Sequence, residues 1–339
     1  MRESVIEVKP LRPDEKIAIA VPTRDRPSYL AVLIACILSQ TYTNWMLVIN
    51  DQSETPVERD HALQDLFNLA KRTGHDVRII RTEKGSERHQ SAMEAVPEDI
   101  ELILRIEDDM FPEPSFLEKV LKPFRFFPDE PLAAVGGLHP EPGNGPRDLD
   151  IALSDPEWIP RFDRPDWRLQ GHFYYNSPEI LEAESLGGGA ILYRRSAVED
   201  AGGWAVPGYS DMAFREESDL CARLYAKGYK MMITTEAIVW HLLAPGGGAR
   251  KYLKTGKGNI MVSGRGDMAS DESVFAETLR GISTAGELSS RGLRRYRLSE
   301  LETGINKPAV LNPSGLTLGI VKRLIRKLKA VRRHIGTER

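Results

Sequence analysis

The amino-acid sequence predicts an α/β fold, in which a mostly parallel central sheet is flanked by helices and followed by a C-terminal helical extension. Between residues 17 and 138, short apolar segments alternate with segments of helical periodicity, the pattern of a parallel sheet covered on both faces. One apolar segment, Leu102–Ile106, leads directly into three consecutive carboxylates, Glu107 to Asp109. With 339 residues and ordinary apolar and charged fractions, the chain can bury a substantial core.

The strands and helices of this sheet are expected in alternating order. Apolar runs predict strands at Ile17–Val21, Met46–Asn50, Val77–Arg81, Leu102–Ile106 and Ala133–Gly137. Helical spacing predicts helices near Tyr29–Ser39, Pro56–Thr73, Glu87–Ala95 and Pro114–Phe124. Later in the chain, similar patterns predict strands at Gly188–Tyr193, Lys230–Thr234 and Ala237–Trp240, and helices from about Ser196 and over Glu216–Lys227. Ligands of such a sheet bind beyond the carboxyl ends of its strands.

These patterns divide the chain into three parts. Residues 1–15 are an N-terminal extension, residues 16–258 the main domain, and residues 259–339 a C-terminal region expected to be helical. Within the main domain, residues 139–186 are rich in Pro, Asp, Gly and aromatic residues without a regular period, which predicts a functional insertion on the acceptor side. Residues 242–257 are rich in Gly and basic residues, and we expect either a flexible lid or a plain surface loop.

Composition favours a cytoplasmic protein. Cys36 and Cys221 lie in predicted helices without the spacing of a metal site, as expected for inert thiols in a reducing compartment. The N-terminal segment lacks the apolar core of a signal peptide, and no later segment approaches the roughly eighteen apolar residues of a membrane span.

The net charge of −3 conceals an asymmetry, because residues 317–339 carry eight Lys or Arg against one Glu. Apolar residues recur at helical spacing among these bases, which predicts a basic amphipathic helix over residues 317–335. Such a helix can lie peripherally on the inner face of an anionic membrane, cover the protein's own domain, or dock on an acidic partner or a second copy in a homo-oligomer. We expect no nucleic-acid partner.

The acidic triplet is the strongest candidate for a metal site. In an extended chain the side chains of Glu107 and Asp109 point to one side and that of Asp108 to the other, so two carboxylates can converge on one divalent ion. Three adjacent acids repel one another, and a cation offsets that repulsion. The alternative from the residues alone is a solvated acidic turn before the helix that starts near Pro114.

Polar side chains also end the first two strands. Thr23, Arg24 and Asp25 can contact a ribose or phosphate, and the Asp51 carboxylate can accept a hydrogen bond from a base N–H. Each of them can instead satisfy its own turn backbone. Because these turns converge where the acidic triplet also lies, their joint placement favours a nucleotide and metal site.

Three features later in the chain are further candidates for this nucleotide and metal site. Gly188 and Gly189 allow a backbone to approach a ligand closely, although the same glycines suit a tight turn. Acids in the first turn of the helix near residue 216 suit the helix dipole, and a carboxylate there can also accept a proton from a hydroxyl. His241 follows a strand and either completes a metal site or has a structural role.

Six segments in order carry a resemblance to a known family. They are AIAVPTRDRPSYL, VINDQS, LRIEDDMFPEPSFLEKV, GGGAILYRRSAVEDAGGW, REESDLCARLYAKGYK and AIVWH. The series, over about residues 16 to 245, closely resembles the motifs of family 2 glycosyltransferases with the GT-A fold, whose central sheet is mostly parallel and Rossmann-like. This resemblance implies an enzyme of the hexosyltransferase class that transfers a sugar from a nucleotide-diphospho-sugar, a UDP-sugar in our expectation, to a hydroxyl of a glycan or lipid-linked acceptor.

The resemblance implies a role for each matching residue. The positions expected to bind the nucleotide sugar are Pro22, Thr23, Arg24, Asp25, Asp51, Arg88, Asp108, Gly188 and Gly189. Asp109, His241 and Glu107 are expected to hold Mn2+ or Mg2+. Glu217 is the expected catalytic base of an inverting reaction, and Glu216 and Asp219 orient the acceptor or its supporting loop.

Two positions and one segment depart from the family pattern. Glu107 and Glu217 stand where the family commonly has Asp, and the usual Arg-Asn pairing between Gly85 and Ala95 is absent, which leaves Arg88 as the phosphate or base contact. Two alternatives stay open: a retaining transferase with, for example, a GDP-sugar donor, and a non-catalytic protein that binds a sugar nucleotide or glycan. No motif of a kinase, ATPase, dehydrogenase or serine hydrolase occurs in a suitable place.

Overall fold

The protein is described here from a computed structural model. The structure describes residues 14–140, 178–187, 189–204, 207–249, 265–285, 293–306 and 308–311, together with residues 6, 8, 10–12, 147–148, 173–174, 252–255 and 258–261. The predicted insertion therefore lies largely outside the described residues, and the predicted basic helix over residues 317–335 lies wholly outside them.

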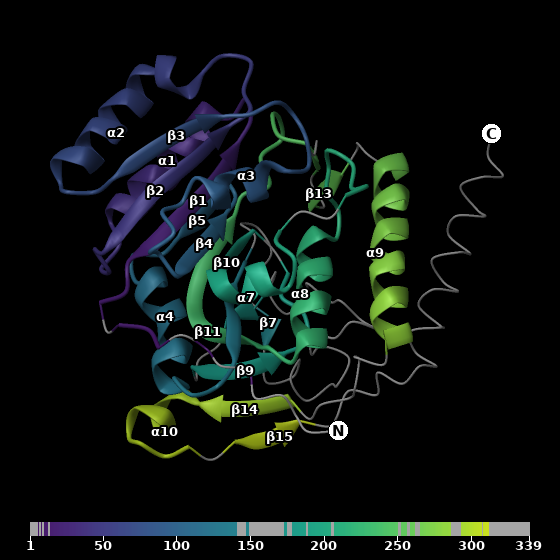
Figure 1. Ribbon diagram of the computed structural model, residues 1–339. Coiled ribbons are helices and arrows are strands. Elements are labelled where there is room, and N and C mark those ends of the chain that lie inside the picture. Colours follow the sequence, from purple (N-terminus) through teal and green to yellow (C-terminus); the bar gives the residue numbers. More distant parts are fainter. Residues whose placement is uncertain are drawn as a thin grey trace.

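An eleven-stranded sheet forms the centre of the molecule (Figure 1). Its first half consists of four parallel strands in the order β4-β1-β2-β3. These strands are β1 (Ile17–Thr23), β2 (Trp45–Asp51), β3 (Val77–Arg81) and β4 (Leu102–Ile106). The structure thus confirms the predicted α/β fold with a mostly parallel sheet, and it brings the carboxyl ends of these strands to one rim.

The second half of the sheet mixes strand directions. Strand β10 pairs antiparallel with both β4 and β6, whereas β6 and β11 are parallel to each other. The strands involved are β5 (Met110–Pro112), β6 (Leu132–Leu138), β9 (Glu179–Ala183), β10 (Ala190–Arg194) and β11 (Lys230–His241). The two strands predicted between residues 230 and 240 are one strand, with a change of register between Ile233 and Ile238.

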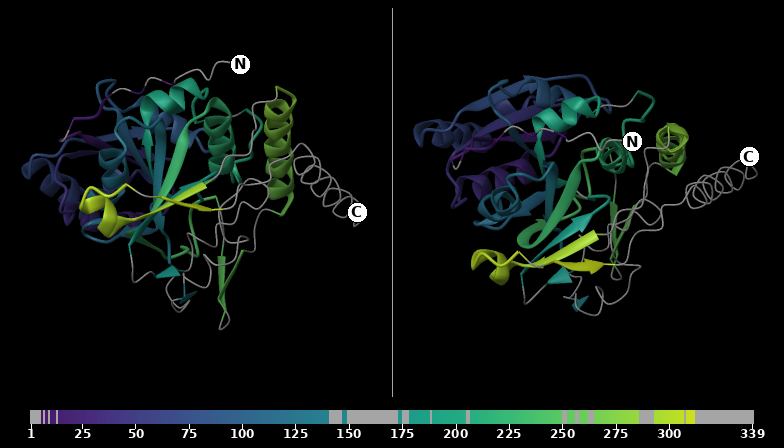
Figure 2. Two further views of the ribbon diagram at one scale, coloured as in Figure 1. Left: turned by 90° about the horizontal axis from the view of Figure 1, so that it is seen from below. Right: turned by 60° about the horizontal axis from the view of Figure 1, so that its bottom comes forward.

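The edge opposite β3 is built from the C-terminal region (Figure 2). Strand β14 (Leu293–Arg297) pairs with β9 and is followed by α10 (Leu298–Glu302) and β15 (Ala309–Leu311). The region expected to be helical therefore also contributes strands. The sequence of β14 does not alternate clearly between apolar and polar residues, and its contacts are remote in sequence. The Tyr296 ring, for example, packs at a tilt of 52° against that of Phe127, with centroids 4.7 Å apart.

Helices cover both faces of the sheet, as the alternation of side chains requires. In β1, Ile17 and Ile19 face one apolar cluster and Ala18 and Ala20 the other. The first cluster includes side chains of α1 (Pro27–Leu38), α2 (His61–Arg72) and α4 (Phe116–Phe126). The second includes those of α3 (Arg88–Glu94), α7 (Arg195–Asp200), α8 (Glu216–Lys227) and α9 (Arg265–Ala285).

Four short strands and one short helix complete the description. They are η1 (Val57–Arg59), β7 (Arg147–Asp148), β8 (Phe173–Tyr174), β12 (Tyr252–Thr255) and β13 (Gly258–Met261). Within the described part of the chain, no helix combines the length and the apolar character needed to cross a membrane. Both cysteines are free, and burial raises the pKa of the Cys221 thiol to about 12.

Candidate active site

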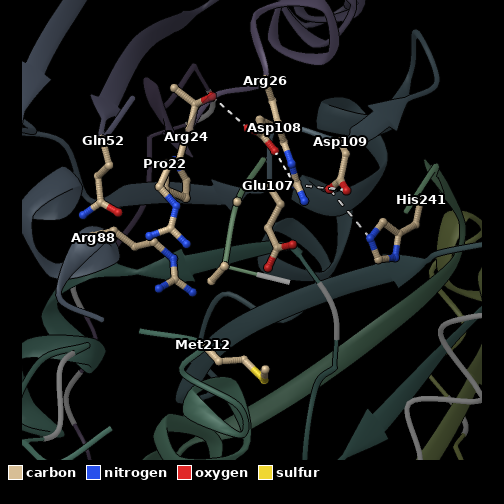
Figure 3. Close-up of a pocket in the computed structure, with 13 residues that line it drawn as sticks. Pro22, Arg24, Arg26, Gln52, Arg88, Glu107, Asp108, Asp109, Met212 and His241 are labelled. Atoms are coloured by element: carbon tan, nitrogen blue, oxygen red, sulfur yellow. Dashed lines mark hydrogen bonds and ion pairs between the residues drawn. The ribbon is translucent and has the colours of Figure 1, made fainter. Parts of the chain in front are cut away.

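A pocket opens at the rim formed by the ends of β1, β2, β4 and β11 (Figure 3). Its walls are Pro22, Thr23, Arg24, Arg26, Gln52, Arg88, Glu107, Asp108, Asp109, Met212, His241, Gly248 and Ala249. Eight of the residues predicted from the sequence are among them. The pocket is lined by both carboxylates and guanidinium groups, which is the composition expected where a cation and an anionic ligand bind side by side.

A short reversal of the chain after β4 brings the acidic triplet to His241. Residues 107–110 form a turn in which the Met110 N–H donates to the Glu107 carbonyl, and β5 then runs antiparallel to the end of β11. Met110 is the register partner of His241. As a result, ligand atoms of Glu107, Asp109 and His241 all lie within 4.8 Å of one another.

The Asp109 carboxylate fits a divalent cation. Its Oδ2 atom accepts hydrogen bonds from the Ala244 N–H at 2.9 Å and from Arg26 Nη1 at 3.3 Å. Its buried Oδ1 atom has no hydrogen-bond partner among the residues that the structure describes, and it lies 3.7 Å from His241 Nε2. A buried carboxylate oxygen is costly to leave unpaired, so a cation at this point would satisfy it. Carboxylate and imidazole ligands suit Mn2+ and, with oxygen ligands dominating, Mg2+.

Gly189 positions Glu107 in this group. The Glu107 N–H donates to the Gly189 carbonyl at 2.7 Å, and a Cβ atom on Gly189 would lie 2.7 Å from Glu107 Cγ. Only glycine leaves room for the Glu107 side chain at this point. Gly188, the other predicted glycine, lies outside the described residues.

Asp108 faces β1 instead of His241, and the turn over residues 107–110, not an extended chain, places it there. Its Oδ2 accepts a hydrogen bond from Thr23 Oγ1 at 2.8 Å, and its Oδ1 from Arg26 Nη1 at 3.0 Å. Burial, together with the charge of Asp109, raises the pKa of the Asp108 carboxyl, although Arg26 and Thr23 oppose that shift. The cation that holds this pair, Arg26, was missing from the sequence-based assignment.

Two further guanidinium groups line the pocket, and one aspartate holds both. Arg24 Nη1 donates to Asp211 Oδ2 at 2.7 Å, and Arg88 Nη1 donates to the Asp211 carbonyl at 3.0 Å. Both arginines were predicted as contacts of the nucleotide sugar. Their positive charges lie beside the carboxylates of the metal group, where a bridging diphosphate would need them.

Three predicted nucleotide contacts, Asp51, Asp25 and Gly189, are not among the residues of the pocket wall. Asp51 is 1% exposed, and its carboxylate accepts hydrogen bonds from the Ser53 and Val57 N–H groups and from Arg81 at 2.6 Å. Asp25 is exposed and accepts a hydrogen bond from the Glu54 N–H. Both carboxylates stabilise turns of the backbone in this structure, the alternative considered for them, and their contact with a ligand stays a prediction.

The acids at the start of α8 gather around a buried guanidinium. Arg105 Nη2 lies 2.7 Å from Glu216 Oε1, 2.9 Å from Glu217 Oε1 and 3.7 Å from Glu107 Oε1. Burial lowers the pKa of Arg105, but the charges of Glu217, Glu216 and Glu107 outweigh it, so the net shift is upward. His89 also contacts this guanidinium, and burial and Arg105 lower the pKa of its imidazole.

The chain enters α8 through two strained residues. Ala213 and Arg215 have φ angles of 49° and 78°, in the left-handed region that residues with side chains rarely adopt. Asp271 of α9 holds this turn by accepting hydrogen bonds from the N–H groups of Ser210 and Phe214 at 2.6 and 2.7 Å. The surrounding contacts therefore fix the strained turn that directs the first turn of α8 at the rim.

Asp219 is more buried than the other two acids in the first turn of α8, Glu216 and Glu217. It is fully buried and accepts hydrogen bonds from Arg223 Nε at 2.8 Å and the Tyr209 hydroxyl at 3.3 Å. Arg223 in turn donates to the carbonyls of Ala201 and Gly203. Asp219 thus contacts, through Arg223, the loop after α7, and both roles considered for it stay predictions.

A sequence comparison identifies the family of the chain. The model of the family described as "Glycosyl transferase family 2" matches residues 18–202. The chain belongs to glycosyl transferase family 2. The predicted family is thereby confirmed, and membership places the chain among the glycosyltransferases of class EC 2.4. No curated protein matches the chain by sequence at a significant level.

Comparison with solved structures bears on the fold of this glycosyltransferase. S. aureus TarS 1-349 in complex with UDP is 13% identical with a TM-score of 0.50, over 78% of this chain and 65% of that one. The mannosyltransferase PcManGT from Pyrobaculum calidifontis, in complex with GDP-Man and Mn2+, is 14% identical with a TM-score of 0.47, over 85% and 69%. The chain spans 39% of a longer TarS structure. TarS 1-349, for which the TM-score reaches 0.50, is a GT-A glycosyltransferase, and the predicted GT-A fold is confirmed.

Replacing Asp109 by Asn tests the metal group. We expect Asp109→Asn to weaken Mn2+ binding by about 10-fold or more, since even loss of a partner outside the ligand shell costs about that much. Isothermal titration of the protein with Mn2+ alone measures this, with Asp65→Asn on the exposed face of α2 as the control. Unchanged Mn2+ affinity in Asp109→Asn would show that the ion does not bind at Asp109.

Proposed function

We propose that this glycosyltransferase uses a divalent metal ion to transfer a sugar from a nucleoside diphosphate sugar, a UDP-sugar, to a hydroxyl of a glycan or lipid-linked acceptor. The observation that carries the proposal is the unpaired, buried Oδ1 of Asp109 beside Glu107 and His241, in a pocket that also holds Arg24 and Arg88. A cation site next to two fixed guanidinium groups suits a diphosphate that bridges them.

The metal group consists of Asp109, His241 and Glu107, which would hold Mn2+ or Mg2+. The bound ion would act as a Lewis acid that offsets negative charge on the departing nucleoside diphosphate. Arg24 and Arg88, which line the same pocket, would bind the same diphosphate. Because Asp211 holds both guanidinium groups in place, they need little reorganisation when the charge develops.

Glu217 is the base in this proposal. Its side chain is 12% exposed, and Arg105 fixes one carboxylate oxygen at 2.9 Å, which leaves the carboxylate oriented at the start of α8. Glu216 lies between Arg105 and Arg88 and would orient the acceptor side of the site. Proton transfer from the acceptor hydroxyl to Glu217 would accompany attack on the anomeric carbon from the face opposite the diphosphate, with inversion.

If Glu217 is the base, its replacement should slow sugar transfer without weakening donor binding. We expect Glu217→Gln to lower kcat by about 100- to 10,000-fold, the usual contribution of a general base, while the affinity for the donor with Mn2+ stays nearly constant. Rates of transfer and titration of the donor measure the two effects, with Glu199→Gln on α7 as the control. Normal turnover in Glu217→Gln would exclude this residue as the base, and a product with the donor's anomeric configuration by NMR would establish a retaining reaction.

Residues 242–257 form the proposed lid, whose described part contacts the charged wall of the pocket. Arg26 Nε donates to the Gly246 carbonyl at 2.9 Å, and the Gly248 N–H donates to the Arg24 carbonyl at 2.8 Å. Gly247 has a φ angle of 68°, and a Cβ atom there would lie 2.5 Å from Arg26 Cγ. The lid and the metal group thus share Arg26.

Adjacent glycines give a matched test of the lid. We expect Gly247→Ala to detach the loop and to reduce donor affinity, whereas Gly246→Ala, whose Cβ would meet nothing within 4 Å, changes neither. Limited trypsin digestion after Arg250 reports loop protection, and donor plus Mn2+ should slow cleavage in the wild type and in Gly246→Ala. Equal cleavage with and without donor in the wild type would argue against closure.

The acceptor and the membrane contact rest on sequence features beyond the described residues. We propose that the basic amphipathic segment over residues 317–335 holds the enzyme at an anionic membrane, near a lipid-linked acceptor. In flotation with vesicles containing anionic lipid, the full chain should float, and replacing Lys322, Arg323, Arg326 and Lys327 by Gln should abolish flotation. Equal flotation of both proteins, or of neither, would contradict the membrane contact.

A further inference from the structure

Gln52 occupies the pocket position that the sequence analysis assigned to Asp51. It follows β2 directly, is 5% exposed, and lines the pocket beside Pro22 and Arg24 (Figure 3). Its backbone N–H donates to the Thr23 carbonyl at 2.9 Å, which fixes the turn against the end of β1. The carboxylate of Asp51 is meanwhile occupied by two backbone N–H groups and Arg81.

Contacts within the protein fix which way the Gln52 amide points. The Nε2 atom lies 2.6 Å from the Glu83 carbonyl, which can only accept a hydrogen bond, so this atom is the amide nitrogen. Its second contact is Thr82 Oγ1 at 3.2 Å. The Thr82 hydroxyl donates its own hydrogen to Asn50 Oδ1 at 2.9 Å, so its oxygen is free to accept from Gln52.

The chain of hydrogen bonds ends on the backbone of α3. Asn50 Nδ2 donates to the Arg88 carbonyl at 2.9 Å, which fixes the Asn50 amide in turn. Both Nε2 hydrogens of Gln52 are therefore used, and its Oε1 atom is held as an acceptor at the pocket wall. Among the described residues, no donor is bonded to this Oε1 atom.

We infer that Gln52 Oε1 reads the nucleobase of the donor by accepting the imide N3–H of a uracil or thymine ring. This role requires the nucleoside diphosphate sugar donor proposed above. The imide N–H is a single donor between two ring carbonyls, and an acceptor fixed by its own network complements it without reorganisation. Cytosine carries a lone pair instead of a hydrogen at N3, so it would oppose Oε1 with a second acceptor.

A fixed polar group discriminates strongly against ligands that lack its partner, since the group is then buried without a hydrogen bond. Gln52 therefore sets the base specificity of the enzyme, whereas the arginines and the metal group bind the diphosphate that all nucleoside diphosphates share. Base selection and diphosphate binding are consequently separable by mutation.

Titration calorimetry of the full chain with Mn2+ and nucleoside diphosphates tests this assignment. In the wild type, UDP should bind about 10-fold or more tightly than N3-methyl-UDP or CDP, which corresponds to loss of one well-placed hydrogen bond. dTDP is included because it has the same imide; its affinity relative to UDP tells which of the two rings the enzyme takes.

In Gln52→Met, which keeps the side-chain volume, the preference for UDP over N3-methyl-UDP should fall to about 3-fold or less. Gln64→Met on the exposed face of α2 should retain the full preference. The comparison of ligands in the wild type stands even if Gln52→Met does not fold.

Equal binding of UDP, N3-methyl-UDP and CDP, or tighter binding of GDP, would overturn the role of Gln52 and leave the proposed transferase function intact. Failure of every nucleoside diphosphate to bind would overturn both. Retention of the preference for UDP in a folded Gln52→Met protein would likewise exclude Gln52 as the reader of the base.

Discussion

The site depends on the neutralisation of five carboxylates that the fold concentrates at one rim. Glu107, Asp108 and Asp109 end β4, and Glu216 and Glu217 begin α8. Two guanidinium groups hold them apart and in place: Arg26 lies between Asp108 and Asp109, and Arg105 contacts an oxygen of each of the three glutamates. Buried charges of one sign are tolerated only when paired, and removing one partner of such a pair costs about 3–5 kcal/mol. The geometry of these five acids therefore follows from where the two arginines are anchored, one at the start of α1 and the other within β4.

The balance of charge is incomplete, which indicates what the pocket binds. Asp109 Oδ1 and Arg105 Nη1 are both buried and neither has a hydrogen-bond partner among the described residues. A cation beside Asp109 Oδ1 would satisfy this oxygen, and the neighbouring side chains of Glu107 and His241 are suitable ligands for that cation. Burial also raises the pKa of the Asp108 carboxyl, and added positive charge nearby would favour its charged form. A bound divalent ion would supply that positive charge, and the oxygens of a diphosphate would accept hydrogen bonds from Arg24 and Arg88.

The sequence was sufficient to predict the parallel half of the sheet and most of the rim. Apolar runs such as Ile17–Val21 are buried on both faces, and the polar residues that end them must then lie at the carboxyl edge. Other features depend on contacts that no local pattern contains. Strand β14 exists because it pairs with β9, more than a hundred residues earlier. Arg105 lies within an apolar strand, and the residue pattern of that strand does not predict that its side chain pairs with Glu216 and Glu217 of α8. The choice between Asp51 and Gln52 rests on the turn after β2, since adjacent side chains point in opposite directions and only the folded turn decides which of them faces the pocket.

Arg88 connects the two functions of the pocket through three separate contacts. Its carbonyl accepts the hydrogen bond from Asn50 that fixes the side chains contacting the Gln52 amide. Its Nη1 atom donates to the Asp211 carbonyl, and its Nη2 atom lies 3.5 Å from Glu216 Oε1. A shift of α3 would therefore move the acceptor that faces the base and the carboxylate beside Glu217 together. The Arg-Asn pairing expected from the family resemblance is absent from the segment that contains α3. Hydrogen bonds from Asn50 to the Arg88 carbonyl and from Thr82 to Asn50 connect α3 to the end of β2 instead. If Gln52 reads the base as proposed, binding of the correct base would stabilise, through Asn50 and the Arg88 carbonyl, the same helix whose Arg88 side chain contacts Glu216 of α8.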